Sequence, residues 1–536
     1  MSLGSRLLAP FAFSALVLLA GCGNSSSPSN PTPPPSGGFS NASLNGTYTF
    51  SVGGQNSNGI FTMAGSFVAC GCTQGAISSG RVDLNDPSGP ASASSIGGNS
   101  SYHITSDGRG IARLLITTAA NVAINEIDID FVLTSTSHGL VIRFDGFGTG
   151  SGTIDLQPAA VSQTALAASP YVFFLSGADL NNLPATTVGA VTVSSTGAIS
   201  TGVQDFNYNG TPSTQLAVSG SITVGTGTAP GSATLATSFG TLGFSVYAID
   251  ATHLKLIEND GQFVMVGDLV TQGSASIPAG TLVFTMSGLD KAGLFVTAGT
   301  MNSDGSSQIT KGSEDVNDAG VVDNNTNPAA PFAFTGNFSS TAGGRFQVAL
   351  TNYVGGTLFA AYPSSAGLFL MQIDTVNPGV TAGIAFTQQS GATLSASQGY
   401  GLNLTGVDLS AGAEFDLIAE IKTTSTAMTG LVDSNDNGSP ATSNVNGTYS
   451  VVNGLGSASF TTGLPGIFFY PLDGSTAVAI TTDPTVVLLG SFELQTAPGS
   501  SALASGRRSF AVPMSRVLPN SRSASQKNRG RFNRGR

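Results

Sequence analysis

Short runs in which apolar and polar residues alternate make up most of the chain beyond residue 43. Such runs, rich in Val, Ile, Thr, Phe and Tyr, are typical of β-strands with one buried face. Turn dipeptides such as Asp107-Gly108 separate the runs and suit tight hairpins. In the first stretch this pattern predicts eight short strands: Gly46–Val52, Phe61–Val68, Ala76–Leu84, Ser101–Thr105, Gly110–Ile116, Ile127–Leu133, Leu140–Phe144 and Gly152–Leu156.

The pattern repeats along the chain. One motif, Gly-x-x-Asp-x-Asn, occurs four times, with its Asp residues 122, 110 and 118 positions apart. A strand-like ending that closes in Gln recurs at steps of 115, 116 and 107 residues. A repeated period predicts tandem copies of one structural unit. The motif pairs are Asp83/Asn85, Asp205/Asn207, Asp315/Asn317 and Asp433/Asn435, and the closing residues are Gln157, Gln272, Gln388 and Gln495.

Four units of about 110–120 residues fit the usual domain size. The strand-like runs in every unit predict an all-β chain. The loops within a unit are short enough to join sequential antiparallel strands. Each unit is therefore expected to be a small up-and-down barrel, with a β-sandwich as the alternative. One run, Leu417–Ile421, fits either a strand or a helical turn. The expected units span residues 43–158, 166–273, 279–389 and 396–496.

The N-terminus predicts export. A basic residue followed by an apolar run makes residues 1–21 a secretory signal. The run ends in Leu19-Ala20-Gly21-Cys22, which resembles the lipobox of bacterial lipoproteins; the alternative is an ordinary signal peptide with a chance Cys. The resemblance implies a lipidated Cys22 that holds the protein on a membrane, at the outer membrane or cell surface. Residues 22–42 are rich in Pro and Ser and predict an extended tether.

Charge is distributed unevenly. The chain has 19 basic and 30 acidic residues, but nine of the basic residues and none of the acidic ones follow Glu493. The acidic body repels polyanions, which argues against nucleic acid as a partner. The Ser-, Arg- and Gly-rich segment 497–536 predicts a disordered basic tail. This tail either holds a polysaccharide or another anionic surface, or contacts the acidic body.

The repeated Asp and Asn are candidate cation ligands. Carboxylate and carbonyl oxygens at alternate positions suit a hard cation such as Ca²⁺. The stretch from Asp433 to Gly438 matches the opening of a calcium loop, although its twelfth position is Asn444. The alternative is a structural turn closed by local side-chain hydrogen bonds. The candidate ligands are Asp83, Asn85, Asp205, Asn207, Asp315, Asn317, Asp433, Asn435 and Asn437.

Few other residues suggest chemistry. Cys70 and Cys72 are expected to form a local disulfide in an exported chain. Glu126, Asp128 and Asp130 share one face of a strand, which is expected to be solvated. The three histidines are expected to be unrelated in position, and the sequence has no nucleophile elbow, zinc-binding helix motif or phosphate loop. The sequence therefore predicts a protein that is not an enzyme and that needs no cofactor.

Four stretches of the first unit stand out: Leu44-Asn45-Gly46-Thr47-Tyr48-Thr49-Phe50, Ala64-Gly65-Ser66-Phe67, Asp107-Gly108-Arg109-Gly110 and His138-Gly139-Leu140-Val141-Ile142-Arg143-Phe144. They resemble repeat-bearing predicted lipoproteins of acidobacteria, which are mostly uncharacterised. The Gly-x-x-Asp-x-Asn motif extends this resemblance to the other units. The opening Gly-x-Tyr-x-Phe and the Asp-Gly-x-Gly hairpin also resemble lipocalin-like β-barrels. Neither resemblance implies an activity.

These observations predict a non-enzymatic, lipid-anchored protein of the cell envelope whose tandem β units serve in binding, adhesion or envelope structure. One alternative is a lipocalin-like carrier with open barrels for a small apolar ligand, although the bulky Phe, Leu and Ile of the strands favour filled interiors. Another is a secreted carbohydrate-active enzyme that uses acids such as Asp128. The membrane is the expected partner through the lipid. The ligand and the oligomeric state stay open.

Overall fold

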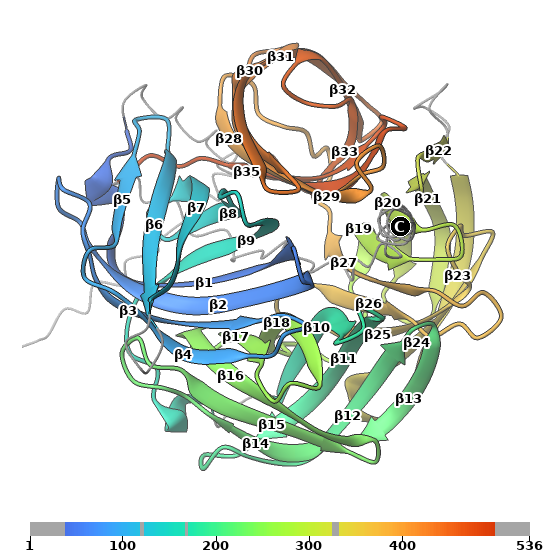
Figure 1. Cartoon of the computed structure of the whole chain (residues 1–536). Coiled ribbons are helices and arrows are strands. Elements are labelled where there is room, and N and C mark those ends of the chain that lie inside the picture. Colours follow the sequence, from blue (N-terminus) through green and yellow to red (C-terminus); the bar gives the residue numbers. More distant parts are fainter. Residues whose placement is uncertain (1–37, 118–122, 167–169, 324–331, 499–536) are drawn as a thin grey trace, which may run out of the picture. The chain divides into compact units, whose positions relative to one another are not determined.

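The computed structural model describes residues 38–117, 123–166, 170–323 and 332–498. The predicted signal, Cys22, most of the tether and nearly all of the basic tail lie outside these residues. The described chain folds into four closed antiparallel sheets, which we call barrels 1 to 4 (Figure 1). Its helical segments are three short 3₁₀ turns, Asn41–Ser43, Gln163–Leu166 and Ala342–Gly344. No helix of this part of the chain has the length and apolar character needed to cross a bilayer.

Barrels 1 and 2 each contain nine strands, eight in the closed sheet and one paired at its side. Barrel 1 consists of β1 (Asn45–Asn56), β2 (Gly59–Cys70), β3 (Ile77–Asn85), β4 (Ala91–Ile96), β5 (Ser101–Ile104), β6 (Arg109–Thr117), β7 (Ala123–Ser135), β8 (His138–Arg143) and β9 (Gly148–Gln157). Barrel 2 consists of β10 (Pro170–Asp179), β11 (Pro184–Val193), β12 (Ala198–Tyr208), β13 (Thr211–Ala217), β14 (Ser219–Thr223), β15 (Gly231–Thr237), β16 (Gly240–Asp250), β17 (His253–Glu258) and β18 (Phe263–Thr271).

Barrel 3 repeats this plan, and barrel 4 closes with eight strands alone. Barrel 3 consists of β19 (Ala279–Leu289), β20 (Leu294–Asp304), β21 (Gln308–Asp318), β22 (Val321–Asp323), β23 (Phe332–Ser340), β24 (Phe346–Thr351), β25 (Leu358–Pro363), β26 (Leu368–Gln372) and β27 (Val380–Thr387). Barrel 4 consists of β28 (Gly399–Asp408), β29 (Ala413–Thr423), β30 (Ala427–Asp436), β31 (Ser439–Val452), β32 (Leu455–Thr462), β33 (Ile467–Pro471), β34 (Thr476–Thr481) and β35 (Val486–Leu494).

The prediction of four tandem up-and-down barrels is confirmed. Around each closed sheet the strands follow chain order once the side strands β5, β13 and β22 are left out, and the first strand pairs with the last, as β1 does with β9. The β-sandwich alternative is thereby excluded. Strand β4 (Ala91–Ile96) was not predicted, because its Ser- and Ala-rich sequence lacks bulky apolar residues. The ambiguous run Leu417–Ile421 lies within strand β29.

Paired glycines narrow the seam where the first and last strands of each barrel meet. A Cβ on Gly54 would lie 2.1 Å from the carbonyl oxygen of Thr149, and one on Gly152 would lie 1.7 Å from that of Ser51. Only glycine permits so close an approach of two backbones. The equivalent pairs in the other barrels are Gly177 with Gly267, Gly288 with Gly383, and Gly406 with Gly490.

Side chains fill the barrel interiors and also cover much of the outer walls. Inside barrel 3 the rings of Phe284, Phe334 and Tyr353 pack edge to face or tilted, and a cavity of about 10 Å³ is left. Outside, Phe174 of barrel 2 stacks on Phe369 of barrel 3 at 5.2 Å, within one apolar cluster shared by barrels 2, 3 and 4. The four barrels therefore fall within a single compact unit of the chain.

Candidate functional site

An Asn side chain joins each barrel to the next. Nδ2 of Asn85, at the end of β3, donates to the carbonyl oxygens of Glu258 and Phe263, both at 2.9 Å, on either side of the turn between β17 and β18. Each other motif Asn contacts the turn between the last two strands of the following barrel. Those contacts are Asn207 with Gln372 and Gly379, Asn317 with Thr481 and Val486, and Asn435 with Arg143, Asp145 and Gly148. Barrel 4 thus contacts barrel 1, and the order of contacts closes on itself.

The motif Asp accepts hydrogen bonds from a Tyr or an Arg of the next barrel. The pairs are Asp83 with Tyr247 (2.9 Å), Asp205 with Tyr362 (2.5 Å), Asp315 with Tyr470, and Asp433 with Arg109 (3.1 Å). The fully buried Arg345 also donates to both oxygens of Asp205, at 2.6 and 3.0 Å. A buried group that loses its partner is costly, so these pairs favour one arrangement of neighbouring barrels.

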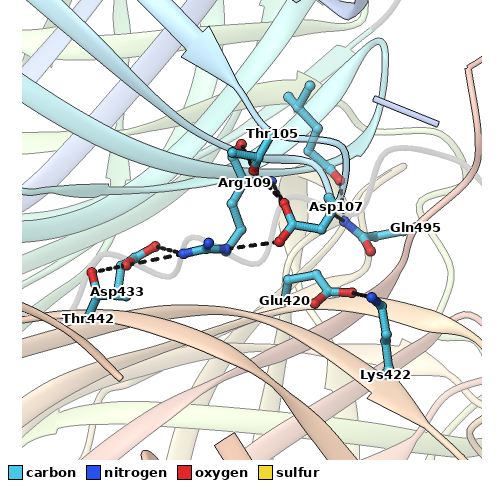
Figure 2. Close-up of polar contacts among 9 residues, drawn as sticks. Thr105, Asp107, Arg109, Glu420, Lys422, Asp433, Thr442 and Gln495 are labelled. Atoms are coloured by element: carbon cyan, nitrogen blue, oxygen red, sulfur yellow. Dashed lines mark hydrogen bonds and ion pairs between the residues drawn. The ribbon is translucent and has the colours of Figure 1, made fainter. Parts of the chain in front are cut away.

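The junction between barrels 4 and 1 is rich in charge. Figure 2 shows Arg109, at the start of β6, between Asp107 of its own barrel and Asp433 of β30. Thr442 donates a further hydrogen bond to Asp433 at 2.6 Å. Gln495, which follows β35, donates through Nε2 to the carbonyl oxygen of Asp107 at 2.8 Å. The last residues of barrel 4 therefore hold the β5–β6 hairpin of barrel 1.

Two carboxyl groups at this junction have raised pKa values. Burial raises the pKa of Asp130 to about 8, with a further contribution from the charges of Asp433 and Asp128. Burial also raises the pKa of Glu420 to about 7, although Lys422, with Nζ 4.0 Å from Oε1, partly opposes the shift. The negative charge of the junction therefore changes around neutral pH.

The Gln that closes each unit also reaches the next barrel. Gln157 donates to the carbonyl oxygen of Ala248, and Gln388 donates to that of Pro471, both at 2.7 Å. Gln272 differs, because its Nε2 has no hydrogen-bond partner within the described residues and lies against Gly344 of barrel 3. Both sequence markers of the repeat thus mark contacts between barrels.

A series of buried ionisable side chains runs through barrels 4, 1 and 2. Its members, in order of contact, are Glu493, His138, Asp155, Lys255, Asp268 and His253, separated by 2.7 to 3.7 Å. Burial lowers the pKa of His138, but Glu493 and Asp155 outweigh it and raise that pKa to about 10. Burial raises the pKa of Asp155, but His138 and Lys255 outweigh it and hold that pKa below its usual range. Positive and negative groups therefore alternate where three barrels meet.

The barrel seams border a small cavity of about 50 Å³. Residues of all four barrels line it, among them Ser51, Ser176, Thr285 and Thr405. One water molecule needs about 10–15 Å³, so the cavity has room for a few waters and not for an organic ligand.

The motif Asp and Asn side chains, which were predicted as cation ligands, have protein partners in this structure. Asn85 and its equivalents present amide nitrogen, a hydrogen-bond donor, to the neighbouring carbonyl groups, whereas a cation requires oxygen. The alternative, a turn closed by a local side-chain hydrogen bond, is found at Asn317. Its Oδ1 accepts a hydrogen bond from the backbone N–H of Gly320 at 3.1 Å. Asn437 lies in the β30–β31 turn with a φ of 49°. Over the described ranges, no group of three His, Cys, Asp or Glu is placed to hold a metal. Calcium binding stays a prediction.

The expectation of three unrelated histidines is wrong. His138 and His253 each begin the seventh strand of a closed sheet, and they lie 115 residues apart, the spacing of Gln157 and Gln272. Comparing this spacing with that of the Gln residues would have revealed the pair. The seam glycines were also missed, although Gly152, Gly267, Gly383 and Gly490 recur at the same steps as the Gln residues.

Two local predictions have different outcomes. Cys70 and Cys72 are joined by a disulfide at the end of β2. The expectation of a solvated acidic face on β7 is wrong at Asp130, which is buried because the outer wall of barrel 1 packs on barrel 4. Asp128 lies 3.7 Å from Nε of Arg113, and Glu126 is exposed and 3.0 Å from the same atom.

No family model matches the chain, and no curated protein matches it. Among solved structures, one assigned as an AttH protein from Nitrosomonas europaea is 12% identical, with 46% of this chain and 98% of that chain covered and a TM-score of 0.16. The WD40 domain of SCAP from fission yeast is 7% identical, with 74% of this chain and 94% of that chain covered and a TM-score of 0.13. At these TM-scores neither likeness carries an argument about function.

Proposed function

We propose that this chain is a non-enzymatic, lipid-anchored protein of the cell envelope in which four β-barrels act as one body for binding, adhesion or envelope structure. The observation that carries the proposal is the use of the repeated Asp and Asn. In all four copies these side chains bind the following barrel. A repeated polar pair that holds domains together supports a mechanical role better than a repeated active site.

The packing of the barrels also supports this role. Barrel 3 leaves about 10 Å³ inside, which is too small for an apolar ligand. Bulky apolar side chains also fill the other barrel cores. A lipocalin-like carrier function is therefore not favoured.

The lipid anchor is tested by growing cells with an alkyne analogue of palmitate and comparing the wild type with Cys22→Ser. We expect the label and the recovery in the membrane fraction to be lost in Cys22→Ser, because no other residue resembles a lipobox cysteine. The double variant Cys70→Ser/Cys72→Ser is the matched control and should keep both. Labelled, membrane-bound Cys22→Ser protein would contradict the proposed anchor.

A further inference from the structure

A cleft of about 480 Å³ lies between the outer wall of barrel 3 and the β31–β32 turn of barrel 4. Thr281, Asn302 and Lys311 line it on the side of barrel 3. Leu282 and Met301, the sequence neighbours of the first two, belong to the interior cluster of this barrel. Because Lys311 pairs with Asn302, all three lining side chains face outward. Ligand sites have volumes of roughly 300–1,000 Å³, so the cleft is large enough for a ligand.

Leu455, which also lines the cleft, takes the place in barrel 4 that Arg345 has in barrel 3. Both residues lead into the fifth strand of a closed sheet, and the next residue pairs with the one that comes directly before Tyr362 or Tyr470. The connection before Leu455 consists of residues 453–454, an Asn-Gly pair with φ of 54° and 81°, which is typical of a tight hairpin. Barrel 4 therefore has an apolar side chain where barrel 3 has a cation.

The motif Asp at this junction has fewer partners than its equivalent in barrel 2. Asp205 accepts hydrogen bonds from Arg345 at both of its oxygens, at 2.6 and 3.0 Å, and from Tyr362. Asp315 accepts a hydrogen bond from Tyr470 at Oδ2, whereas its Oδ1 is buried and has no hydrogen-bond partner among the described residues. A buried carboxylate oxygen without a donor is costly. Asp315 is therefore suited to a further donor of the kind that Arg345 supplies to Asp205.

Asp315 lies beside the cleft. Ser313 comes two positions before it on the same face of β21, and Tyr470 binds it; both of these residues line the cleft. Burial raises the pKa of Asp315 to about 6, although the hydrogen bond from Tyr470 partly opposes the shift. The carboxyl group is therefore largely ionised at neutral pH. The exposed Lys311 is four residues away, about 13 Å along the strand, so it leaves the charge of Asp315 without compensation.

The chain has its own source of arginine outside the described residues. Nine of its 19 basic residues, and none of its acidic ones, follow Glu493. This segment leaves barrel 4 after β35, which finishes at the same end of the barrel as the β31–β32 turn because successive strands alternate in direction. Arg507 follows Gln495 by 12 residues, which span up to about 40 Å when extended. Half the circumference of eight strands spaced about 4.8 Å apart is roughly 20–25 Å, so these arginines can reach the cleft.

We propose that the cleft between barrels 3 and 4 binds an arginine side chain of the segment 499–536 of the same chain, with the guanidinium group on Asp315. A guanidinium group matches a carboxylate in geometry and is more weakly hydrated than an ammonium group, so it suits a buried partner. The hydroxyl of Thr281 and the amide of Asn302 are placed to bind the backbone beside that arginine. One arginine in the cleft leaves the other basic residues free. This inference goes beyond the proposed envelope role and does not depend on the lipid anchor.

The chemistry is tested on a full-length parent in which Gln replaces the nine basic residues after Glu493, titrated at physiological ionic strength with a synthetic peptide of residues 499–536. We expect Asp315→Asn to weaken peptide binding about 10- to 100-fold, because charge-assisted hydrogen bonds are lost while Tyr470 keeps an acceptor. Leu455→Arg supplies a guanidinium group from barrel 4 itself and should have the same effect. Asp304→Asn, at an exposed acid of barrel 3, is the matched control and should bind as the parent does. Equal binding by all four proteins would overturn the proposal.

The location is tested in the full chain with its natural tail and the photo-cross-linking residue p-benzoylphenylalanine at position 453, on the rim of the cleft. We expect a cross-link to a peptide from residues 499–536 of the same chain, identified by mass spectrometry, and its loss when Leu455→Arg is added. The same residue in place of Thr226, which is exposed in the corresponding connection of barrel 2, is the control and should give no such cross-link. Folding of each variant is checked by its melting curve. Absence of the cross-link at position 453, or a cross-link that joins two copies of the chain, would overturn the assignment.

Discussion

Asparagine suits the task of joining two backbones, because its short side chain carries two amide N–H donors. The acceptors are carbonyl oxygens next to the turn between the last two strands of the neighbouring barrel. Buried carbonyl groups of this kind need a donor, and at a free surface water would supply it. At each junction the Asn side chain takes the place of that water and so specifies which surface lies opposite.

Replacing Asn317 by Ala should destabilise the protein. The carbonyl oxygens of Val486 and Thr481, 2.9 and 3.2 Å from Nδ2, would lose this donor in a buried environment, and that of Val486 would keep the Thr481 hydroxyl at 3.1 Å. We expect the free energy of unfolding to fall by about 1–3 kcal/mol, seen as a lower melting temperature. Asn302→Ala, at an exposed residue of the same barrel, is the control and should change it by less than about 0.5 kcal/mol. Equal melting temperatures of the two variants would contradict this role.

The seam glycines should tolerate no side chain. Gly152→Ala would place a Cβ 1.7 Å from the carbonyl oxygen of Ser51, so β1 and β9 would have to separate. We expect loss of soluble protein, or a melting temperature lower by many degrees. In Gly98→Ala the nearest atom to the new Cβ is 3.9 Å away, so this control should melt as the wild type does.

At the scale of the strands, the alternation of apolar and polar residues predicted where strands lie. It did not predict which outer faces are buried by another barrel. Regular alternation identified the eight strands expected in barrel 1. Strand β4 (Ala91–Ile96) shows no such alternation, because nearly all of its residues are Ala or Ser. Asp130 was expected in water because its strand neighbours are apolar. The partner on its outer face comes from barrel 4, about 300 residues away in the sequence, and local alternation carries no record of such a partner.

The candidate site was predictable in position but not in role. The period showed that Asp83 and Asn85 have three equivalents, and the structure places all four pairs at equivalent junctions. Oxygen-rich side chains at alternate positions fit a cation, a turn or a contact between domains equally well. The distinction depends on which atoms face the amide groups, and these atoms belong to a different barrel.

The junction between β7 and barrel 4 should depend on pH. The pKa of Asp130 is raised to about 8 in the folded state, against an ordinary value near 4. A raised carboxyl pKa gives stability that is complete below the unfolded pKa and is lost as pH rises through the folded pKa. Stability should therefore fall between about pH 4 and pH 8. Asp130→Asn should make this fall in the melting temperature shallower, with Glu420 still contributing to it, and Glu126→Gln, at an exposed acid of the same strand, should leave it unchanged.

At the scale of the whole molecule, barrel 1 has the smallest apolar contacts with its neighbouring barrels. Barrels 2, 3 and 4 share one large apolar cluster, whereas barrel 1 meets barrel 4 through a small cluster around Ile418 and meets barrel 2 through small clusters around Ala64 and Ile60. Its other contacts are polar, including the pair of Arg109 and Asp433. Polar contacts are more easily replaced by water, so barrel 1 should separate first.

Arg109→Met should promote this separation. It removes the cation between Asp107 and Asp433 and leaves two carboxylates facing each other across the junction. We expect faster hydrogen exchange in β6 and β30, measured by mass spectrometry, and unchanged exchange in β20 and β34. Arg113→Met, at an arginine that is 56% exposed on the same strand, is the control. Unchanged exchange in β30 of Arg109→Met would show that the arginine does not hold the junction.

The basic tail gives a further whole-molecule prediction. If residues 497–536 hold an anionic surface, a chain that ends at residue 498 should elute from immobilised alginate at lower salt than the full chain. Polyanion binding that rests on Arg and Lys weakens steeply with salt, so the difference should vanish at high ionic strength. Equal elution of the two chains would favour a tail that contacts the acidic body.

The closed order of contacts means that the position of the chain ends is not dictated by the fold. Phe39 and Gln495, near the two ends of the described body, lie against the same residue, Gly108, at 3.0 and 2.7 Å from the site of a Cβ there. A short linker between them would therefore complete the chain as a loop, and new ends could be opened in any of the three segments between barrels. Circular permutants that start at barrel 2, 3 or 4 should form the same set of junctions. The reason is that the chain enters each barrel at its first strand and leaves it at its last, and these two strands are paired.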